Sequence, residues 1–180
     1  ADLKEFQESG KKEDKDGQQF LDKLGFVFNK IRNCQKPIMC GLNGITMAGG
    51  LELAMCCDII FASDKAKIGD AHSNYGIFPG AGGTAVLPQR IGSHNAKYML
   101  FSGNAFSAHR LYEMGLVQEV IEDKQLENRL SEFADLLSKK SALTLSAMKE
   151  MADLSINTPI TSSLKIELEL ARRHSQSKDM

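Results

Sequence analysis

A pair of glycines directly before an apolar segment constrains this sequence more than any other feature. Gly49 and Gly50 follow a strand-like stretch, and residues 51–55 are apolar except at position 52. Residues 45–57 therefore predict a strand, a glycine turn and a helix that begins near Gly49. The first N–H groups of a helix have no intrahelical partner, and glycine lets a ligand approach them closely. The pair indicates either an anion or oxyanion site, or only close packing at a turn.

A single carboxylate lies inside this segment. Glu52 is three residues after Gly49 and is the only acidic residue between Asp22 and Asp58. A carboxylate among apolar neighbours loses hydration, which suits it to proton transfer. A glutamate that stabilises the dipole of its own helix fits the pattern equally well. The pattern alone leaves both interpretations open.

The rest of the chain predicts an α/β core followed by helices. Residues 8–19 are polar and predict a surface loop, and Thr84 is the expected cap of a helix that follows the loop at residues 79–83. We expect strands at residues 38–42, 58–63, 66–69 and, at a sheet edge, 117–121. Apolar residues at three- and four-residue spacing predict helices at 20–33, 95–102, 108–114, 126–139, 142–153 and 160–174.

Composition excludes several classes of protein. The formal net charge is −1, which argues against nucleic-acid binding, and no apolar run is long enough to span a bilayer. No histidine–carboxylate cluster has metal-ligand spacing, and the four cysteines form no C-x-x-C pair, so we expect reduced thiols and no metal site. No signal peptide is visible. The expected location is the cytoplasm, or the mitochondrial matrix in a eukaryote.

Several segments together resemble the enoyl-CoA hydratase/isomerase (crotonase) superfamily. They are N-G-I-T-M-A-G-G-L-E-L-A-M-C-C-D at residues 43–58, G-I-F-P-G-A-G-G-T at 76–84, L-P-Q-R-I-G at 87–92 and A-D-L-K-E at 1–5. The resemblance covers nearly the whole chain. It implies an α/β crotonase-like spiral of β-β-α turns at residues 1–122 and a helical trimerisation region at 123–180. It also implies that the first strands and the last helix of the family lie outside this chain.

The resemblance also implies a site. In the family, two backbone N–H groups hold the thioester oxygen of an acyl-CoA, and the matching residues here are Ala1 and Gly49. Glu52 matches a catalytic glutamate. The residues expected to contact the substrate or its CoA are Asp2, Leu3, Lys4, Met47, Gly50 and Gly80. Coenzyme A is part of the substrate, so no separate cofactor is expected, and the expected assembly is a homo-trimer or hexamer.

One position departs from the family pattern. Hydratases and isomerases of the family carry a second glutamate four residues before the glycine that matches Gly76, and here that residue is His72. His72 is either an acid/base group or a polar residue that lines the pocket. The resemblance favours hydration of a 2-enoyl-CoA to a 3-hydroxyacyl-CoA. The histidine keeps isomerisation, decarboxylation, C–C hydrolysis or a non-catalytic acyl-CoA-binding role open.

Overall fold

A computed structural model describes residues 15–176 of the 180-residue chain. These residues divide into two compact units: residues 15–33 and 38–130 form the first, and residues 34–37 and 131–176 form the second. The division falls inside α7 (Leu126–Ser138). The boundary between residues 122 and 123 stays a prediction about how the family's core and helical region are arranged.

Two small sheets lie at the centre of the first unit. One is parallel throughout, in the order β1 (Met39–Leu42), β3 (Ile59–Ser63), β6 (Glu119–Ile121). The other pairs β2 (Ile45–Met47) in parallel with β4 (Lys67–Gly69), which pairs antiparallel with β5 (Phe106–Ser107). Parallel strands need crossover connections, and α3 (Gly49–Ala54), which lies between β2 and β3 in the chain, is part of both the β1-to-β3 and the β2-to-β4 crossover. The helix that bears Glu52 therefore connects a strand of one sheet to a strand of the other.

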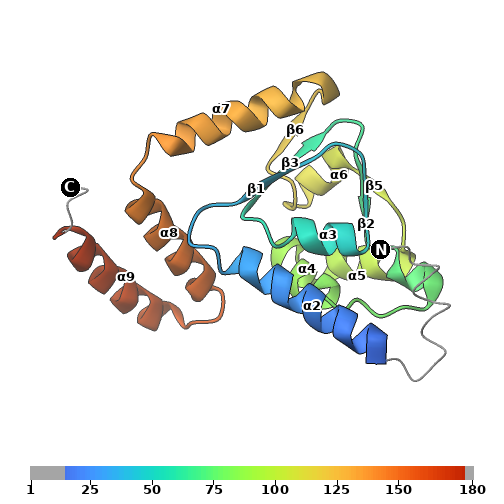
Figure 1. The fold of residues 1–180 in the computed structure, drawn as a ribbon, viewed down its shortest axis with the longest axis horizontal. Helices are drawn as coiled ribbons and strands as arrows, with labels where there is room; N and C mark the ends of the chain where they lie inside the picture. Colours follow the sequence, from blue (N-terminus) through green and yellow to red (C-terminus); the bar gives the residue numbers. More distant parts are fainter. Residues whose placement is uncertain (1–14, 177–180) are drawn as a thin grey trace. The chain divides into compact units, whose positions relative to one another are not determined.

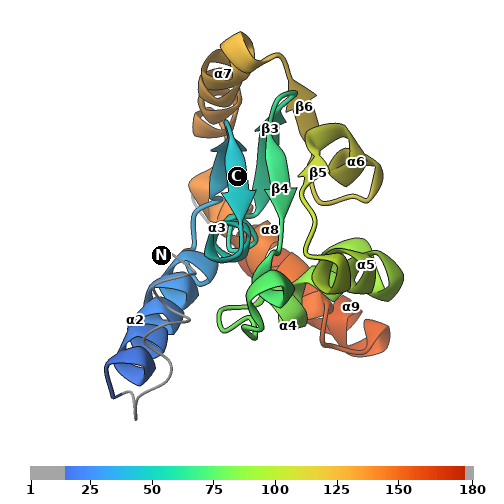
Figure 2. The same cartoon turned by 90° about the vertical axis from the view of Figure 1, so that its right-hand side faces the viewer.

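The first unit also contains the start of α7 and further helices, namely α2 (Lys15–Arg32), α4 (Gly83–Ile91), α5 (Ser93–Ser102), α6 (Ala108–Glu113) and the 3-10 turns η1 (His72–Tyr75) and η2 (Asp123–Gln125). Figures 1 and 2 both place α3 directly below the strands, with α4 and α5 beyond it. Leu51 of α3 and Met55, which directly follows that helix, are almost wholly buried together with Leu87 of α4 and Ile68 of β4. This shared core fixes α3 against the strand that leads to His72.

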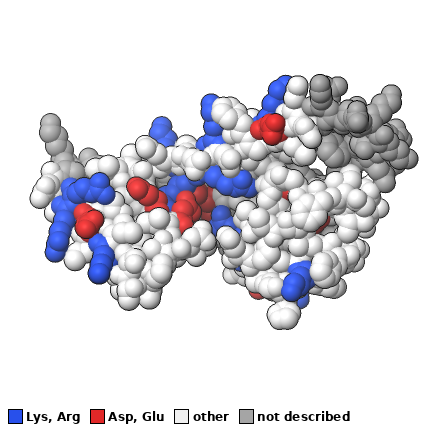
Figure 3. Space-filling view, turned by 90° about the horizontal axis from the view of Figure 1, so that it is seen from below, with Lys and Arg blue, Asp and Glu red and all other residues white. Residues whose placement is uncertain are grey.

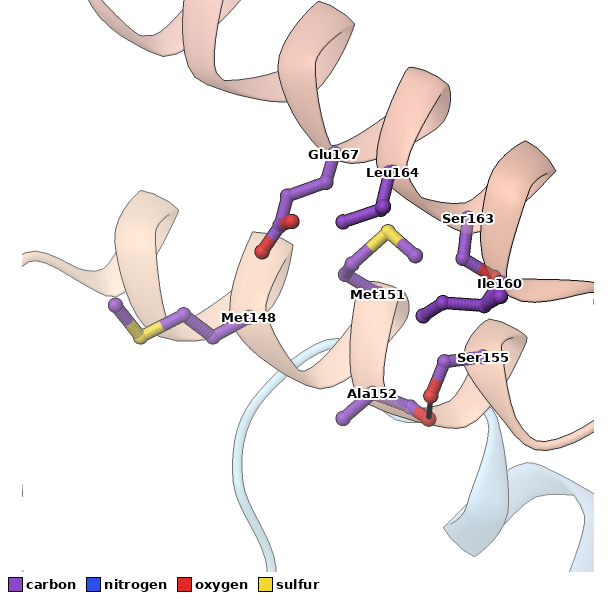
Figure 4. A pocket seen from close by; sticks show the side chains of 8 residues that line it. All are labelled: Met148, Met151, Ala152, Ser155, Ile160, Ser163, Leu164 and Glu167. Carbon is purple, nitrogen blue, oxygen red and sulfur yellow. Dashed lines mark hydrogen bonds between the residues drawn. The ribbon is translucent and has the colours of Figure 1, made fainter.

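The second unit contains the end of α7, α8 (Ala142–Ser155) and α9 (Ile160–His174). Ser141 caps α8 by accepting a hydrogen bond from the Thr144 backbone N–H at 3.0 Å. Helices α8 and α9 pack against each other, and a pocket of about 340 Å³ lies between them (Figure 4). No helix among residues 15–176 combines the length and the apolar character that crossing a bilayer would require.

Most of the predicted elements are confirmed, including the strand–glycine–helix unit and the edge position of the strand near residue 120. Two predictions are wrong. Residues 15–19 belong to α2 and not to a loop, because polar residues are compatible with the first turns of a helix whose later positions carry the apolar face. Thr84 does not cap α4; Gly82, with φ 125°, occupies that position. The part of the predicted loop at residues 8–14 lies outside the described residues.

Candidate active site

The turn before α3 is held in an unusual backbone conformation. Ala48 has φ 50°, in a region that non-glycine residues rarely adopt, and its N–H donates to the carbonyl of Gly69 at 3.1 Å. Gly49 is the first residue of α3, so its N–H has no intrahelical acceptor. Among the described residues, apart from the chain neighbours of Gly49 and the backbone of α3, no heavy atom lies within 4 Å of where a Cβ on Gly49 would be. Gly49 thus belongs to a fixed turn, and the described residues leave open space beside it.

Glu52 is buried, with 2% of its surface exposed, and one of its oxygens is anchored to a loop. The Oε1 atom accepts hydrogen bonds from the backbone N–H groups of Ala81 at 2.8 Å and Gly83 at 2.9 Å. Two such donors stabilise the ionised carboxylate, which offsets part of the cost of its burial. The same two bonds fix the glycine-rich loop at residues 79–83 on top of α3.

Helix α2 covers that loop from the other side. The guanidinium of Arg32 donates from Nη2 to the carbonyl of Ala81 at 2.7 Å, and Phe28 packs with Cys56 and Ala81 in a small apolar cluster. A Cβ on Gly80 would lie 2.9 Å from the side chain of Leu21. The loop that holds Glu52 is therefore bonded to α3 through its N–H groups and to α2 through a carbonyl.

His72 begins η1 and forms a buried pair with Asp70. Its Nδ1 lies 2.9 Å from Asp70 Oδ1, and its backbone N–H donates to Asp70 Oδ2 at 3.2 Å. The exposed fractions of the two residues are 5% for His72 and 1% for Asp70. The residue between them, Ala71, has φ 63°. The chain therefore turns sharply after β4, and the turn directs the carboxylate back to the histidine.

The charges around His72 favour its protonated form. Burial lowers the pKa of His72, but the hydrogen bond to Asp70 and the negative charges of Asp70 and Glu52 together outweigh burial. The pKa therefore lies above its ordinary value of 6.5. The contribution of Glu52 indicates that the two predicted acid/base residues lie within electrostatic range of each other. Gly83 connects them, because its N–H bonds Glu52 and a Cβ on it would lie 3.1 Å from Asp70 Oδ1.

The other predicted site residues that the structure describes are more exposed than Glu52 and His72. Met47 and Gly49 are half-buried, and Gly50 and Gly80 are exposed. The remaining predicted site residues, Ala1, Asp2, Leu3 and Lys4, lie outside the described residues.

Sequence reasoning missed Asp70 and Arg32. The D-A-H spacing directly after a predicted strand was the available signal for Asp70, whereas nothing in the sequence distinguishes Arg32 from other helix-terminal arginines.

Two of the thiols, Cys40 and Cys56, are held in their unreactive form. All four cysteines are free, and Cys56 and Cys57 are buried. The hydrogen bond with Cys57, together with burial, raises the pKa of Cys40, and burial raises the pKa of Cys56. Raised values keep both groups in the unreactive thiol form at neutral pH. Among residues 15–176, no group of three or more His, Cys, Asp or Glu side chains could hold a metal ion.

The pocket in the second unit has a different character. Its lining is mainly apolar: Met151 of α8 points toward Leu164 of α9, and Met148 and Ile160 also line the pocket (Figure 4). Among the described lining residues, Glu167 contributes the only ionisable side chain. Every residue that lines it belongs to residues 131–176, whereas Gly49, Glu52 and His72 belong to the first unit. Such a lining suits packing of apolar side chains and offers no acid/base pair.

The family model for enoyl-CoA hydratase/isomerase matches residues 1–180. A crotonyl-CoA hydratase of Syntrophomonas wolfei is 34% identical over 143 residues, which cover 79% of this chain and 55% of the relative. A short-chain-enoyl-CoA hydratase of Clostridioides difficile is 36% identical over 138 residues, covering 77% of this chain and 88% of the relative. The chain thus spans about half the length of several curated relatives it matches.

Solved structures agree with the fold. An enoyl-CoA hydratase from Bacillus anthracis superposes with a TM-score of 0.90 at 27% identity, covering 93% of this chain and 65% of that one. An enoyl-CoA hydratase from Thermoplasma volcanium gives 0.84 at 32% identity, covering 90% and 64%. The mixed α/β architecture predicted from the sequence is therefore confirmed as the crotonase fold, over about two thirds of the length of these structures.

Proposed function

Because this chain belongs to the enoyl-CoA hydratase/isomerase family, we propose that it binds an acyl-CoA and stabilises the enolate of its thioester, adding water to a 2-enoyl-CoA to give a 3-hydroxyacyl-CoA. Three relatives whose names specify hydration are 32–36% identical to it, which supports the reaction class at family level.

In the proposed reaction, Gly49 N–H and Ala1 N–H hold the thioester oxygen as negative charge develops on it. One such donor supplies about 3 kcal/mol of transition-state stabilisation. Glu52 takes a proton from the attacking water, which forms the C–O bond at the β-carbon. His72 gives a proton to the α-carbon, and the enolate collapses to the 3-hydroxyacyl thioester. The remaining predicted contacts, from Asp2, Leu3, Lys4, Met47, Gly50 and Gly80, would hold the acyl chain and CoA.

The observation that carries the proposal is the anchoring of Glu52. Its Oε1 is occupied by two backbone N–H groups. The second oxygen, Oε2, forms no hydrogen bond with the described residues. It is also absent from the described polar atoms that are fully buried without a partner, so part of its surface is open. One oxygen is therefore held by the fold and the other is available to a water molecule. A general base needs this combination of fixed position and a free acceptor.

The replacement Glu52→Gln tests the proposal with little change in structure. The amide oxygen of glutamine can still accept from Ala81 and Gly83, so the loop keeps its anchor while the base is lost. We expect hydration of crotonyl-CoA, followed by loss of enoyl-thioester absorbance, to fall by about 10²- to 10⁴-fold. Glu150→Gln, an exposed change of the same kind on α8, should leave the rate unaltered. Equal rates in the Glu52→Gln variant and the wild type would exclude the proposed role.

His72 favours a second candidate, another reaction through the same thioester enolate. Isomerisation, decarboxylation and C–C hydrolysis share the oxyanion contacts and differ in the acid/base groups, and His72 replaces a glutamate at one of those positions. A panel of enoyl-, malonyl- and β-ketoacyl-CoA esters separates the candidates. Turnover of a non-enoyl ester alone would exclude hydration. Binding of CoA esters without turnover of any of them would indicate a non-catalytic acyl-CoA-binding protein.

A further inference from the structure

The buried contact between Asp70 and His72 points to a role that the family pattern does not supply. We propose that Asp70 is the positioning residue of His72: its carboxylate holds the proton on Nδ1 and leaves Nε2 as the ring nitrogen that exchanges a proton with the substrate. The inference rests on the proposed function, because it deepens the role of an acid/base residue in the same site.

Asp70 uses both carboxylate oxygens on the same residue. Oδ1 lies 2.9 Å from His72 Nδ1, and Oδ2 accepts from the His72 backbone N–H at 3.2 Å. The first contact fixes the plane of the ring and the second fixes the carboxylate against the backbone. Only 1% of the surface of Asp70 and 5% of that of His72 is exposed, so water competes little for the hydrogen bonds between them. The ring is therefore restricted to one orientation.

The backbone between the two residues is shaped for this contact. Ala71 has φ 63° and ψ −10°, a left-handed conformation that costs an alanine roughly 1–2 kcal/mol. A residue stays in such a conformation only where its surroundings enforce it. Here the Ala71 carbonyl accepts from the Asn74 N–H at 3.1 Å, and the Asn74 side chain donates to the carbonyl of Gly103 at 2.9 Å. The end of α5 therefore holds η1, and η1 holds the histidine on its carboxylate.

The chemistry of imidazole then fixes the tautomer. An ionised carboxylate only accepts hydrogen bonds, so Nδ1 must carry a proton in both the neutral and the charged ring. In the neutral ring Nε2 is consequently the acceptor, and in the charged ring Nε2 is the second donor. Among the described residues no hydrogen bond engages Nε2. Proton exchange is therefore confined to this one atom.

The charges that face the ring come from two elements. Asp70, at the end of β4, and Glu52, on α3, are both negative, and both favour the protonated ring. Helix α5 packs against η1 without a charged side chain that contributes to the His72 pKa, and α4 approaches through Gly83, which has none. Asp70 differs from Glu52 in that it bonds the ring directly. Its removal should change the tautomer as well as the pKa.

Nuclear magnetic resonance of the full chain labelled with ¹⁵N at its histidine rings tests the tautomer directly. His72→Gln identifies which of the four histidine signals belongs to His72. We expect the neutral wild-type ring to carry its proton on Nδ1. A neutral ring protonated on Nε2 would overturn the inference. This measurement needs no turnover and no Asp70 variant, so it gives an answer even where hydration is not the reaction.

The replacement Asp70→Asn tests the consequence. We expect the His72 titration midpoint to move to lower pH, because one negative charge is removed, and the limb of the kcat profile that reports His72 should move with it. We expect kcat to fall by about 10- to 100-fold, part of the contribution of a positioned acid or base, with KM within about twofold. Asp135→Asn, an exposed change on α7, should alter neither quantity.

If Asp70 had only a structural role, Asp70→Asn would lower the free energy of unfolding and leave the titration midpoint of His72 in place. That result would overturn the inference. If the Asp70→Asn protein does not fold, the wild-type tautomer alone decides. If the midpoint moves but no CoA ester on the panel is turned over, Asp70 still orients the His72 ring and sets its tautomer, whereas the proposed function and the proton exchange with substrate fail. The two ideas are thus separable.

Discussion

Two buried carboxylates in the first unit, Glu52 and Asp70, form hydrogen bonds that hold the proposed catalytic residues in place. Glu52 bonds two backbone N–H groups of the loop at residues 79–83, and Asp70 bonds both the ring and the backbone of His72. The placement of Gly49 and Glu52 at the start of a helix was predictable, because a glycine pair and an isolated carboxylate are visible in one short segment. The Asp70–His72 contact depends on Ala71 adopting φ 63°, which a sequence pattern does not reveal for alanine.

The raised pKa of His72 predicts a pH dependence of stability. A histidine whose folded pKa lies above its unfolded value adds stability that is fully present below the unfolded pKa and is lost as pH rises through the folded one. The relevant window starts near the ordinary value of 6.5 and extends above it. We expect the free energy of unfolding of the wild type to fall more between about pH 6 and about pH 9 than that of His72→Gln, measured by urea denaturation.

The comparison uses only the pH-dependent difference between the two proteins, so a constant cost of the substitution does not affect it. His94→Gln, at an exposed position on α5, serves as the control and should keep the wild-type slope. Parallel curves for wild type and His72→Gln would mean that the ring has the same proton affinity in the folded and unfolded chain.

At the scale of elements, close approach of backbones sets the position of the site. A Cβ on Gly69 would collide with the backbone oxygen of Asn104 and would lie 3.0 Å from the Met47 side chain. Gly69 also accepts the hydrogen bond from Ala48 that precedes α3. The alternation of strands and helices was readable from apolar spacing, whereas β5 and η1 are too short to produce a period. These two short elements hold β4 and His72 in place.

The crowding at Gly69 predicts a specific cost. Gly69→Ala should lower the free energy of unfolding by about 1–3 kcal/mol, the range for overpacking a tight contact. Gly25→Ala is the matched change with the opposite expectation. Gly25 lies inside α2, and outside the backbone of that helix no described residue has a heavy atom within 4 Å of the added Cβ, so alanine should stabilise by about 0.5–1 kcal/mol. Urea denaturation of both variants measures the two signs, and a stabilised Gly69→Ala protein would contradict the packing described.

At the scale of the whole molecule, the surface carries charges of both signs and exposed apolar side chains. The face in Figure 3 carries positive and negative side chains interspersed, in keeping with the formal net charge of −1. Large apolar side chains are exposed on α8, α9 and the turn between them, namely Leu143, Met148, Leu154, Ile156, Ile160, Leu164 and Leu168. The spacing of apolar residues predicted these helices and their apolar faces. It does not identify which partner covers an apolar face.

The resemblance to the family predicts a trimer or hexamer, and this apolar surface makes the assembly testable. We expect the wild type to sediment with the mass of three or six chains of 19.8 kDa. Leu164→Lys puts a charge at a half-exposed apolar position on α9 and should shift the distribution towards smaller species. Ser162→Lys adds the same charge at an exposed polar position of the same helix and should not. A monomeric wild type would contradict the expected assembly.

The two bonds at Glu52 Oε1 also bear on inheritance. A lineage of this chain that abandoned catalysis would still lose the anchor of its glycine loop if Glu52 became an apolar residue. Selection for a folded protein would therefore retain a glutamate or glutamine there after selection for turnover had ended. His72 is under no equivalent constraint from that loop, so descendants that gave up the reaction should diverge at position 72 before position 52. The histidine is the better record of what each descendant does.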